Sequence, residues 1–151
     1  MVMLQTKRIK FLKTHPDAVL PERKHADPNT GDSGYDMTAV EDTVIPARGS
    51  AVVPVGLTLA SMPEGIWGRI ESRSGTAFKH NVFSFNGIID NSYTGDLGVK
   101  LINHSDKDYT ALKGDRIAQF VLYPLIVAPV EWTDQVDSTE RGANGFGSTG
   151  R

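Results

Sequence analysis

Five polar stretches that contain glycine carry most of the residues in this chain that could bind or transform a charged ligand. They are SGYDMTAVED (33–42), GRIESRSGTAFK (68–79), NGIIDNSYTGDLGVKLIN (86–103), GDRIAQFVLYP (114–124) and RGANGFGSTGR (141–151). The last one contains GFGSTG, which fits the dinucleotide-binding pattern G-x-G-x-x-G. That pattern binds phosphate where its loop opens a helix. Only Arg151 follows it here, so we expect no helix and no Rossmann loop.

Each stretch also has an ordinary structural interpretation. Asp36 fits an Asx turn, residues 72–75 fit the cap of a helix, and D-N-S at 90–92 fits a hairpin turn. Gln119, in an apolar strand, could satisfy a neighbouring backbone group. The tail could be a frayed chain end. Taken singly, none of the five stretches indicates chemistry.

The residue types exclude several catalytic classes. The chain has no cysteine, which rules out disulfides, a thiol nucleophile and a Cys-ligated zinc site. Its four histidines form no HxH or HExxH spacing, so no metal site made of protein ligands alone is predicted. No Ser-His or Cys-His arrangement is visible, and we therefore expect water to be the nucleophile of any hydrolysis.

The elements that must position these residues are expected to be mostly β-strands. Short extended runs alternate with turn residues such as P-N-T-G-D at 28–32, a spacing that favours a β-sandwich or barrel. One short helix is predicted over residues 75–79, with Ser74 as its N-cap. The predicted strands cover residues 4–11, 35–39, 51–60, 66–71, 87–90, 98–103 and 117–127.

Length and composition indicate one globular domain followed by a polar tail. The chain has 151 residues, of which 39% are hydrophobic and 23% charged, as is typical of a single domain. We predict a β-domain over residues 1–133. Residues 134–151 are polar and Gly-rich, with Phe146 as almost their only apolar residue to bury, and are predicted to form a flexible C-terminal tail.

Charge and hydropathy also limit the partners and the compartment. The net charge of −2 argues against non-specific binding to nucleic acid or membranes, and neither is expected as a partner. The N-terminal stretch mixes charges with apolar residues and lacks the apolar core of a signal peptide. The apolar run at 120–130 is too short to span a bilayer. We expect a cytoplasmic protein, or a nuclear one if the source is eukaryotic.

Taken together, in this order and at these spacings, the five stretches resemble the five motifs of the trimeric dUTPase family. The most specific parts are the tail R-G-x-x-G-F-G-S-T-G and the stretch G-I-I-D-x-x-Y-x-G. The resemblance implies hydrolysis of dUTP to dUMP and pyrophosphate with Mg²⁺, which keeps uracil out of DNA and supplies the precursor of thymidylate.

The resemblance also implies a fold and an assembly. It implies an all-β, jelly-roll-like subunit with one short helix, in a homotrimer whose active sites each draw on three chains. The first, second and fourth motifs would come from one subunit and the third from another. The tail of the remaining subunit would be a lid, disordered when the site is empty, that closes over the bound triphosphate.

Individual roles around the triphosphate follow from the same resemblance. Arg73, Ser74 and Gly75 would supply a guanidinium, a hydroxyl and free backbone N–H groups. Asp36 would lie near the waters of Mg²⁺ as an outer-shell ligand, and Phe146 would stack on the uracil. The remaining residues implied at the phosphates are Ser72, Gln119 and, from the tail, Arg141, Gly147, Ser148 and Thr149.

The third motif would supply the catalytic base and the selectivity. Asp90 would activate water for in-line attack on the α-phosphorus, and Tyr93 would pack under the deoxyribose and leave no room for a 2′-hydroxyl. A hairpin around 84–99 would read uracil through its backbone groups. Ser84 stands where several bacterial relatives carry an Asn that reads uracil. Further substrate-binding residues implied here are Asn86, Gly87, Ile89 and Lys100.

Two alternatives stay open at this point. A dCTP deaminase, or a bifunctional deaminase-dUTPase of the same superfamily, carries a catalytic Glu downstream of the third motif. Residues 99–103 contain none, and Gly75 replaces a Ser typical of those enzymes. A regulatory binding protein that kept the fold would be favoured by loss of Asp90, Arg73 or the tail, all of which are present.

Overall fold

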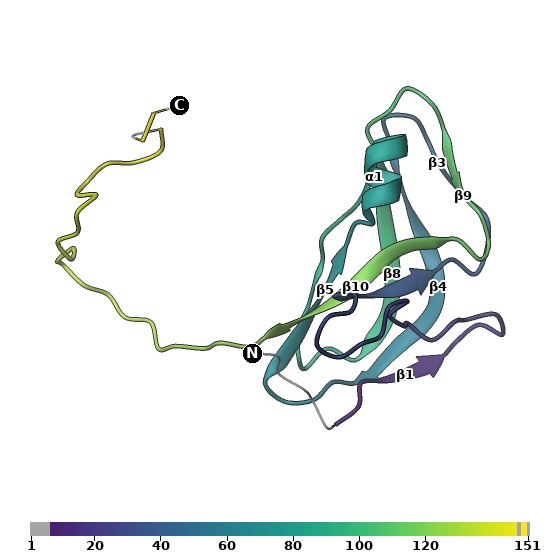
Figure 1. Ribbon diagram of the computed structural model, residues 1–151, viewed down its shortest axis with the longest axis horizontal. Coiled ribbons are helices and arrows are strands. Elements are labelled where there is room, and N and C mark those ends of the chain that lie inside the picture. Colours follow the sequence, from purple (N-terminus) through teal and green to yellow (C-terminus); the bar gives the residue numbers. More distant parts are fainter. Residues whose placement is uncertain (1–6, 148, 151) are drawn as a thin grey trace.

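The computed structural model describes residues 7–147, 149 and 150. These residues form a sandwich of two antiparallel sheets (Figure 1). One sheet consists, in spatial order, of β1 (Lys10–Lys13), β4 (Ser50–Ser61), β8 (Gly95–Asn103) and β6 (Val82–Ser84). The other consists of β2 (Gly34–Thr38), β10 (Arg116–Pro124), β5 (Ile66–Glu71) and β7 (Ile88–Ile89). The prediction of an all-β, jelly-roll-like class is confirmed.

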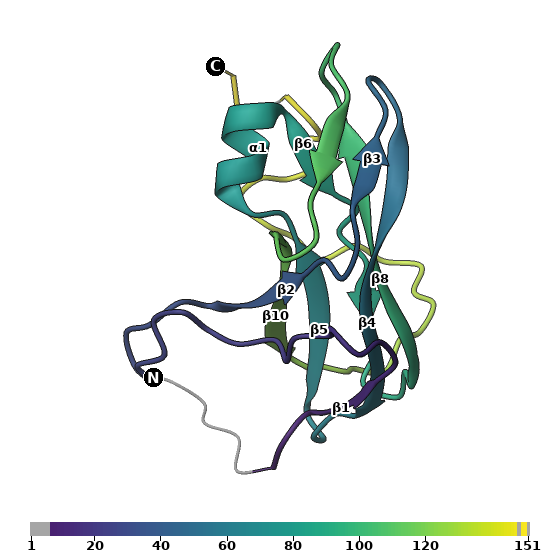
Figure 2. The ribbon, with the colours of Figure 1, turned by 90° about the vertical axis from the view of Figure 1, so that its right-hand side faces the viewer.

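A two-stranded ribbon and one helix complete the fold. Strands β3 (Thr43–Ile45) and β9 (Tyr109–Ala111) pair as a separate ribbon. The helix α1 (Ser74–His80) follows β5 and lies at one end of the sandwich, while β1 lies near the opposite end (Figure 2). No helix among the described residues combines the length and the apolar character needed to cross a membrane.

Most predicted strands are present, with shifted ends. Strand β5 has its predicted bounds, whereas β8 begins at Gly95 rather than at residue 98 and β10 ends at Pro124 rather than at 127. The N-terminal strand covers Lys10–Lys13 instead of 4–11, and residues 1–6 lie outside the described part of the chain. The sequence did not predict β3, β6 and β9, because three residues are too few for an alternating pattern to stand out.

The predicted helix is confirmed, but its predicted cap is wrong by one residue. Arg73 is the N-cap, with an extended backbone (φ −88°, ψ 133°) and no capping bond from its side chain. Ser74 is already helical, and the first helical bond runs from the Ala77 N–H to the Arg73 carbonyl. The Arg73 side chain is drawn instead into an ion pair with Asp36.

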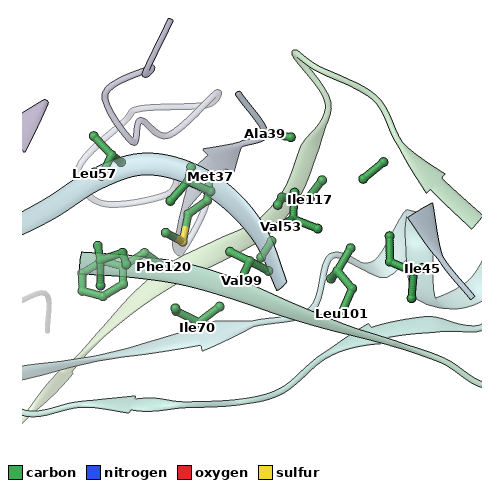
Figure 3. Close-up of a cluster of buried hydrophobic side chains, with 14 of the residues drawn as sticks. Met37, Ala39, Ile45, Val53, Leu57, Ile70, Val99, Leu101, Ile117 and Phe120 are labelled. Carbon is green, nitrogen blue, oxygen red and sulfur yellow. The ribbon is translucent and has the colours of Figure 1, made fainter. Parts of the chain in front are cut away.

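The core lies between the two sheets and follows the alternation of the strands (Figure 3). Buried residues alternate with less buried ones from Val53 to Leu59 in β4, along all of β5 and from Leu97 to Asn103 in β8, as a strand with one face on a core requires. Members of the core include Val53, Val55, Leu59, Val99 and Leu101 from one sheet and Met37, Ile70, Ile117 and Phe120 from the other. The packing fixes the register, because a shift by one residue would turn these side chains to solvent.

One buried polar side chain ties the elements at the end of β8. Asn103 is 1% exposed, and its Nδ2 donates to the carbonyls of Ile45 (3.0 Å) and Lys107 (2.7 Å). Its Oδ1 accepts from the N–H and the hydroxyl of Ser105, at 2.9 and 2.7 Å. The amide is therefore fully satisfied, and it joins β3 to the turn between β8 and β9.

After β10 the chain runs away from the body as an extended segment (Figure 1). Ile126 and Val127 expose 86% and 81% of their surface, and Val130 and Trp132 are also fully open. The exposed run thus begins before residue 134. The division into a domain over 1–133 and a tail over 134–151 stays a prediction.

Candidate active site

A polar cavity of about 400 Å³ opens where β2, β10 and the start of α1 meet. Strand pairing explains its position: Gln119 on β10 lies opposite Asp36 on β2 and opposite Glu71 at the end of β5. The turn that follows β5 then brings Arg73 to the same edge. The lining residues are Lys24, Asp32, Ser33, Gly34, Asp36, Arg73, Ser74, Gly75 and Gln119. The structure therefore brings three of the five motifs together.

Two arginines hold the carboxylate of Asp36. Its Oδ1 lies 3.1 Å from Arg73 Nε and its Oδ2 lies 3.4 Å from Arg116 Nη1. Arg73 Nη1 also donates to the Arg116 carbonyl at 3.1 Å. The Arg73 guanidinium is thus oriented before any ligand binds, and its Nη2 group can still donate to an anion. Arg116 was not predicted, although it lies in the same G-D-R-I-A-Q stretch as Gln119.

Gln119 bonds to a backbone carbonyl, as one of its two interpretations predicted, and it also lies at the cavity. Its Nε2 donates to the Ser72 carbonyl at 3.0 Å, so it does satisfy a backbone group. Its side chain also lines the cavity and lies directly over Gly34. A Cβ on Gly34 would come within 2.1 Å of Gln119 Oε1, and only glycine leaves this space open.

The loop of residues 22–33 forms one wall of the cavity and supplies Lys24 and Asp32, which the sequence did not single out. The Asp32 carboxylate accepts the His25 backbone N–H at 3.1 Å, and this bond, with the His25 ring beside it, lowers the pKa of Asp32. Asp27 accepts the backbone N–H groups of Asn29 and Thr30, which lowers the pKa of Asp27. Both carboxylates therefore stay charged at neutral pH and keep the loop tied.

The same loop separates this cavity from a larger one of about 700 Å³. The larger cavity has an apolar floor that includes Phe11, Tyr35 and Phe120, and no predicted site residue lines it. Its size alone does not indicate the site. The smaller cavity is the better candidate, because convergent charged and amide side chains line it.

The turn after β7 carries the predicted base and sugar contact in a prebuilt hairpin. Asn91 Nδ2 donates to the carbonyls of Pro63 (2.6 Å) and Ile66 (2.7 Å), and so anchors the turn to the body. The Tyr93 N–H donates to the Asp90 carbonyl at 3.0 Å, and the Tyr93 hydroxyl donates to the Asp96 carbonyl at 2.7 Å. The Asp90 side chain is exposed. Asn91 was missed, since D-N-S suggested only a turn.

The side chains at the start of the hairpin form hydrogen bonds and packing contacts within the chain itself. Ser84 is 6% exposed, and its N–H donates to Ser72 Oγ at 2.8 Å. The Asn86 amide nitrogen donates to the carbonyls of Ser84 (3.2 Å) and Ile70 (3.3 Å) in the orientation that satisfies both. The Ile89 side chain packs against the core. What this segment can offer a base is therefore mainly its main chain.

Other predicted residues lie apart from the cavity. Ser72 does not line it, and Lys100 is exposed on β8. Arg141 donates from Nε to the Asn144 carbonyl and from Nη2 to the Gly145 carbonyl, both at 3.0 Å. The remaining tail residues Phe146, Gly147 and Thr149 are exposed, and Ser148 lies outside the described residues.

Within one chain the predicted residues thus form three separate groups. The cavity holds Asp36, Arg73, Ser74, Gly75 and Gln119, while Asp90 and Tyr93 are not among its lining residues. The tail forms the third group. The described residues include no cluster of three or more His, Cys, Asp or Glu that could hold a metal ion.

Comparisons with known proteins show which family this chain resembles over nearly all of its length. The family model described as dUTPase matches residues 23–150. The deoxyuridine 5'-triphosphate nucleotidohydrolase of Oryza sativa subsp. japonica is 43% identical over 142 residues, which cover 94% of this chain and 80% of the relative. The protein of the same name from Gloeothece citriformis is 40% identical, over 95% of this chain and 97% of its own.

Solved structures show the same likeness. The dUTPase of Staphylococcus bacteriophage 80alpha with dUpNHpp superposes with a TM-score of 0.85 at 29% identity, covering 97% of this chain and 100% of that one. A dUTPase from phage phi11 of S. aureus, studied for the coordination of a structural Mg(II) ion, gives a TM-score of 0.76 at 25% identity. It covers 87% of this chain and 100% of its own.

Proposed function

The chain belongs to the dUTPase family, and from this premise we propose how its residues hydrolyse dUTP to dUMP and pyrophosphate. The observation that carries the proposal is the cavity in which Asp36, Arg73 and Gln119 converge beside the start of α1. The reaction would lower the dUTP available for DNA synthesis and supply dUMP for thymidylate. The cytoplasm or the nucleus is the proposed compartment, although a relative from Dictyostelium discoideum is named mitochondrial.

The triphosphate binds in the cavity. The Arg73 guanidinium lines this cavity and is oriented by its ion pair with Asp36 and its hydrogen bond to the Arg116 carbonyl. The backbone N–H groups of Ser74 and Gly75 belong to the unpaired first turn of α1, and the Ser74 hydroxyl adds a donor. Lys24 contributes a second positive charge from the loop wall. A polyanion thus meets donors that are already in place.

Mg²⁺ fits this site as an ion bound mainly to the phosphates. Both oxygens of Asp36 face arginine nitrogens, so this carboxylate suits contact through water better than direct ligation. Mg²⁺ commonly keeps several waters when it binds a nucleotide. When bound, the ion would neutralise charge that develops on the phosphate oxygens. Asp36 would hold its waters.

Asp90 is the proposed general base. Its exposed carboxylate takes a proton from a water molecule, whose oxygen attacks the α-phosphorus in line with the bridging oxygen. The new oxygen–phosphorus bond forms as the bond to pyrophosphate breaks, and pyrophosphate leaves with the charge. Arg73 stabilises the charge that builds up in this step.

Selection of the nucleoside belongs to the same hairpin. The main chain at Asn86 and Ile89 presents donors and acceptors to the uracil edge, while Gly87 ties this segment to the body, since its N–H donates to the Phe85 carbonyl and its carbonyl accepts from the Ile70 N–H. Tyr93 is held by its bond to the Asp96 carbonyl, and its ring packs under the deoxyribose, where a 2′-hydroxyl finds no room. Lys100 is exposed on the neighbouring strand and contributes positive charge.

A homotrimer is the assembly that joins the three separate groups of residues. One chain would provide the cavity, a second Asp90 and Tyr93, and the third its tail. Exposed apolar side chains support association with further copies: Phe85 and Ile88 near the hairpin, and Ile126, Val127 and Val130 after β10, are open to solvent. Contiguous exposed apolar surface commonly marks an interface.

The tail closes the site. Arg141, Ser148 and Thr149 cap the phosphates, Gly147 allows the close approach of the backbone, and Phe146 stacks on the uracil. Phe146 is completely exposed, so burying its ring on a base would stabilise the closed state. Closure would also exclude water other than the attacking molecule.

Pyrophosphate release from dUTP, dCTP, dTTP and UTP tests the proposal directly. We expect release from dUTP to exceed release from the other three by orders of magnitude, and to require Mg²⁺. A dCTP deaminase would instead convert dCTP without releasing pyrophosphate, which a parallel assay for ammonia detects. Release of pyrophosphate from none of the four nucleotides would contradict the proposal and favour a regulatory binding protein.

A further inference from the structure

We propose that Ser72 positions the hairpin that reads the base, and that its hydroxyl thereby sets the selectivity for uracil without contacting the phosphates. The inference rests on the proposed function and deepens it. Ser72 lies in the turn between β5 and α1, next to Arg73, but its hydroxyl faces β6 rather than the cavity.

A hydrogen bond from Ser84 to Ser72 holds the end of β6. Strand β6 lies at the edge of its sheet, and Ser84, its last residue, is buried. The Ser84 N–H donates to Ser72 Oγ at 2.8 Å, and the two hydroxyl oxygens lie 3.3 Å apart. A buried N–H at a sheet edge needs such an acceptor. Ser72 therefore holds the residue at which the chain enters the hairpin.

The contacts beyond Ser84 transmit this constraint to the residues that face the base. The Phe85 N–H donates to the Lys100 carbonyl at 2.8 Å, and the Ile70 N–H donates to the Gly87 carbonyl at 3.1 Å. The Asn86 amide donates to the Ser84 carbonyl. Residues 84–87 are thus fixed from both sheets, and Ser72 supplies the side-chain bond at their first residue.

Selectivity for uracil depends on the fixed position of residues 84–87, because backbone groups of the hairpin form the hydrogen bonds to the base. Uracil and cytosine differ in the donor or acceptor that they present at one edge of the ring. A site built to hydrogen-bond one pattern rejects the other only while its own groups stay in place. A loosened entry to the hairpin lets the main chain adapt, so the preference for uracil should fall together with the affinity.

The phosphate side of the site does not depend on the Ser72 hydroxyl. Gln119 Nε2 bonds to the Ser72 carbonyl, which every substitution retains. Arg73 is oriented by Asp36 and Arg116, neither of which contacts the hydroxyl. Removal of the hydroxyl should therefore separate base recognition from phosphate recognition, which general damage to the turn could not do.

The test compares Ser72→Thr with Ser72→Val, which have nearly the same shape and differ in the hydroxyl; Ser72→Ala provides a smaller second variant. Calorimetry measures the dissociation constants of dUMP, dCMP and imidodiphosphate in the presence of Mg²⁺. We expect Ser72→Val and Ser72→Ala to weaken dUMP binding about tenfold, because the loosened main chain must be ordered again when the nucleotide binds. The preference for dUMP over dCMP should shrink, while imidodiphosphate binds as before. Ser72→Thr should restore the values of the unaltered protein.

Ser92→Ala is the matched control, since it removes an exposed hydroxyl from the same hairpin and should change none of the three constants. Unchanged dUMP binding in Ser72→Val and Ser72→Ala would overturn the proposal. An equal loss for dUMP and imidodiphosphate would also overturn it, because it would show collapse of the whole turn. A protein that prefers dUMP through Ser72 but does not hydrolyse dUTP would contradict the proposed function alone.

Discussion

At the scale of a single residue, Asp90 is the proposed general base, and its carboxylate is exposed on a turn that the Asn91 side chain anchors to the body. Asp90→Asn keeps the size and the turn but removes the proton acceptor. We expect turnover of dUTP to fall at least ~10²-fold, the low end for a general base, while binding of dUpNHpp persists. Steady-state pyrophosphate release and calorimetry measure the two effects.

Asp106→Asn is the control for Asp90→Asn. Asp106 is also an exposed carboxylate, but it pairs with Arg48 in another turn. Its replacement should leave turnover unchanged, because an exposed ion pair contributes little. Turnover of Asp90→Asn within a factor of two of the unaltered protein would remove Asp90 from the role of base.

Tyr93 and Gly95 are proposed to determine together how much space lies beneath the sugar. A Cβ at position 95 would come within 2.7 Å of the Tyr93 hydroxyl, so the ring can stay in place only over a glycine. Tyr93→Ala opens the space directly, and Gly95→Ala should displace the ring. We expect both variants to raise the ratio of kcat/KM for UTP to that for dUTP by roughly tenfold.

Tyr93→Phe keeps the ring and should keep the low ratio, which separates the packing of the ring from the bond of its hydroxyl. The measurement is kcat/KM for each nucleotide from initial rates. A ratio that stays constant in both Tyr93→Ala and Gly95→Ala would show that another group rejects the 2′-hydroxyl.

At the scale of the elements, Asn103 joins β8, β3 and the following turn through four hydrogen bonds. Asn103→Ala removes the partner of the buried Ile45 carbonyl and those of the part-buried Lys107 carbonyl and Ser105 N–H, and a buried group left unpaired costs about 1–3 kcal/mol. We expect the free energy of unfolding to fall by about 2–4 kcal/mol, measured by urea denaturation at constant protein concentration. Asn29→Ala, at an exposed position, should have almost no effect. A loss as small as that of the control would contradict this role of Asn103.

The described residues of the tail are exposed and do not pack against the rest of their own chain. Trypsin can cut it after Arg141, which lies in an exposed segment. We expect rapid cleavage there in the free protein and protection of about tenfold or more by dUpNHpp with Mg²⁺, because closure orders the segment. Mass spectrometry follows the loss of residues 142–151.

Phe146→Ala supplies the control for this experiment, since it keeps the cleavage site but removes the ring that would stack on the base. Protection should be weaker in this variant, as stacking contributes roughly 1–3 kcal/mol per base. Equal cleavage rates with and without the nucleotide in the unaltered protein would show that the tail is passive.

The elements also show what a sequence can predict and what it cannot. Long strands such as β4 and β5 alternate buried and exposed residues, and this period is visible in the letters. Arg73 and Gln119 were found because their motifs are specific. Arg116 and Asn91 were missed, because what they do depends on carbonyls and carboxylates from distant strands. A side chain's partner is fixed by strand pairing, which no local pattern contains.

At the scale of the whole molecule, we propose that a single chain leaves the site incomplete. The cavity, the Asp90 turn and the tail form separate groups of residues, and large apolar side chains after β10 stay exposed. An active site shared between three subunits was predicted from the family resemblance alone. Composition and periodicity describe a single chain and carry no information about contacts with other subunits. The three-chain site therefore needs an experiment in which base and tail come from different subunits.

Mixed trimers provide that experiment. One variant carries Asp90→Ala with its tail intact, and the other is truncated after Val136 with Asp90 intact. Each homotrimer should be inactive, because every site lacks either the base or the lid.

The two variants are co-refolded in equal amounts, and native mass spectrometry, which distinguishes them by length, shows whether mixed trimers form. If base and tail reach a site from different subunits, each donor is intact half the time under random assembly. Roughly a quarter of the sites should then recover activity. If both came from one chain, no mixture could restore activity, because no chain carries both. Mixed trimers without recovered activity would therefore reject the shared site and leave dUTP hydrolysis itself untouched.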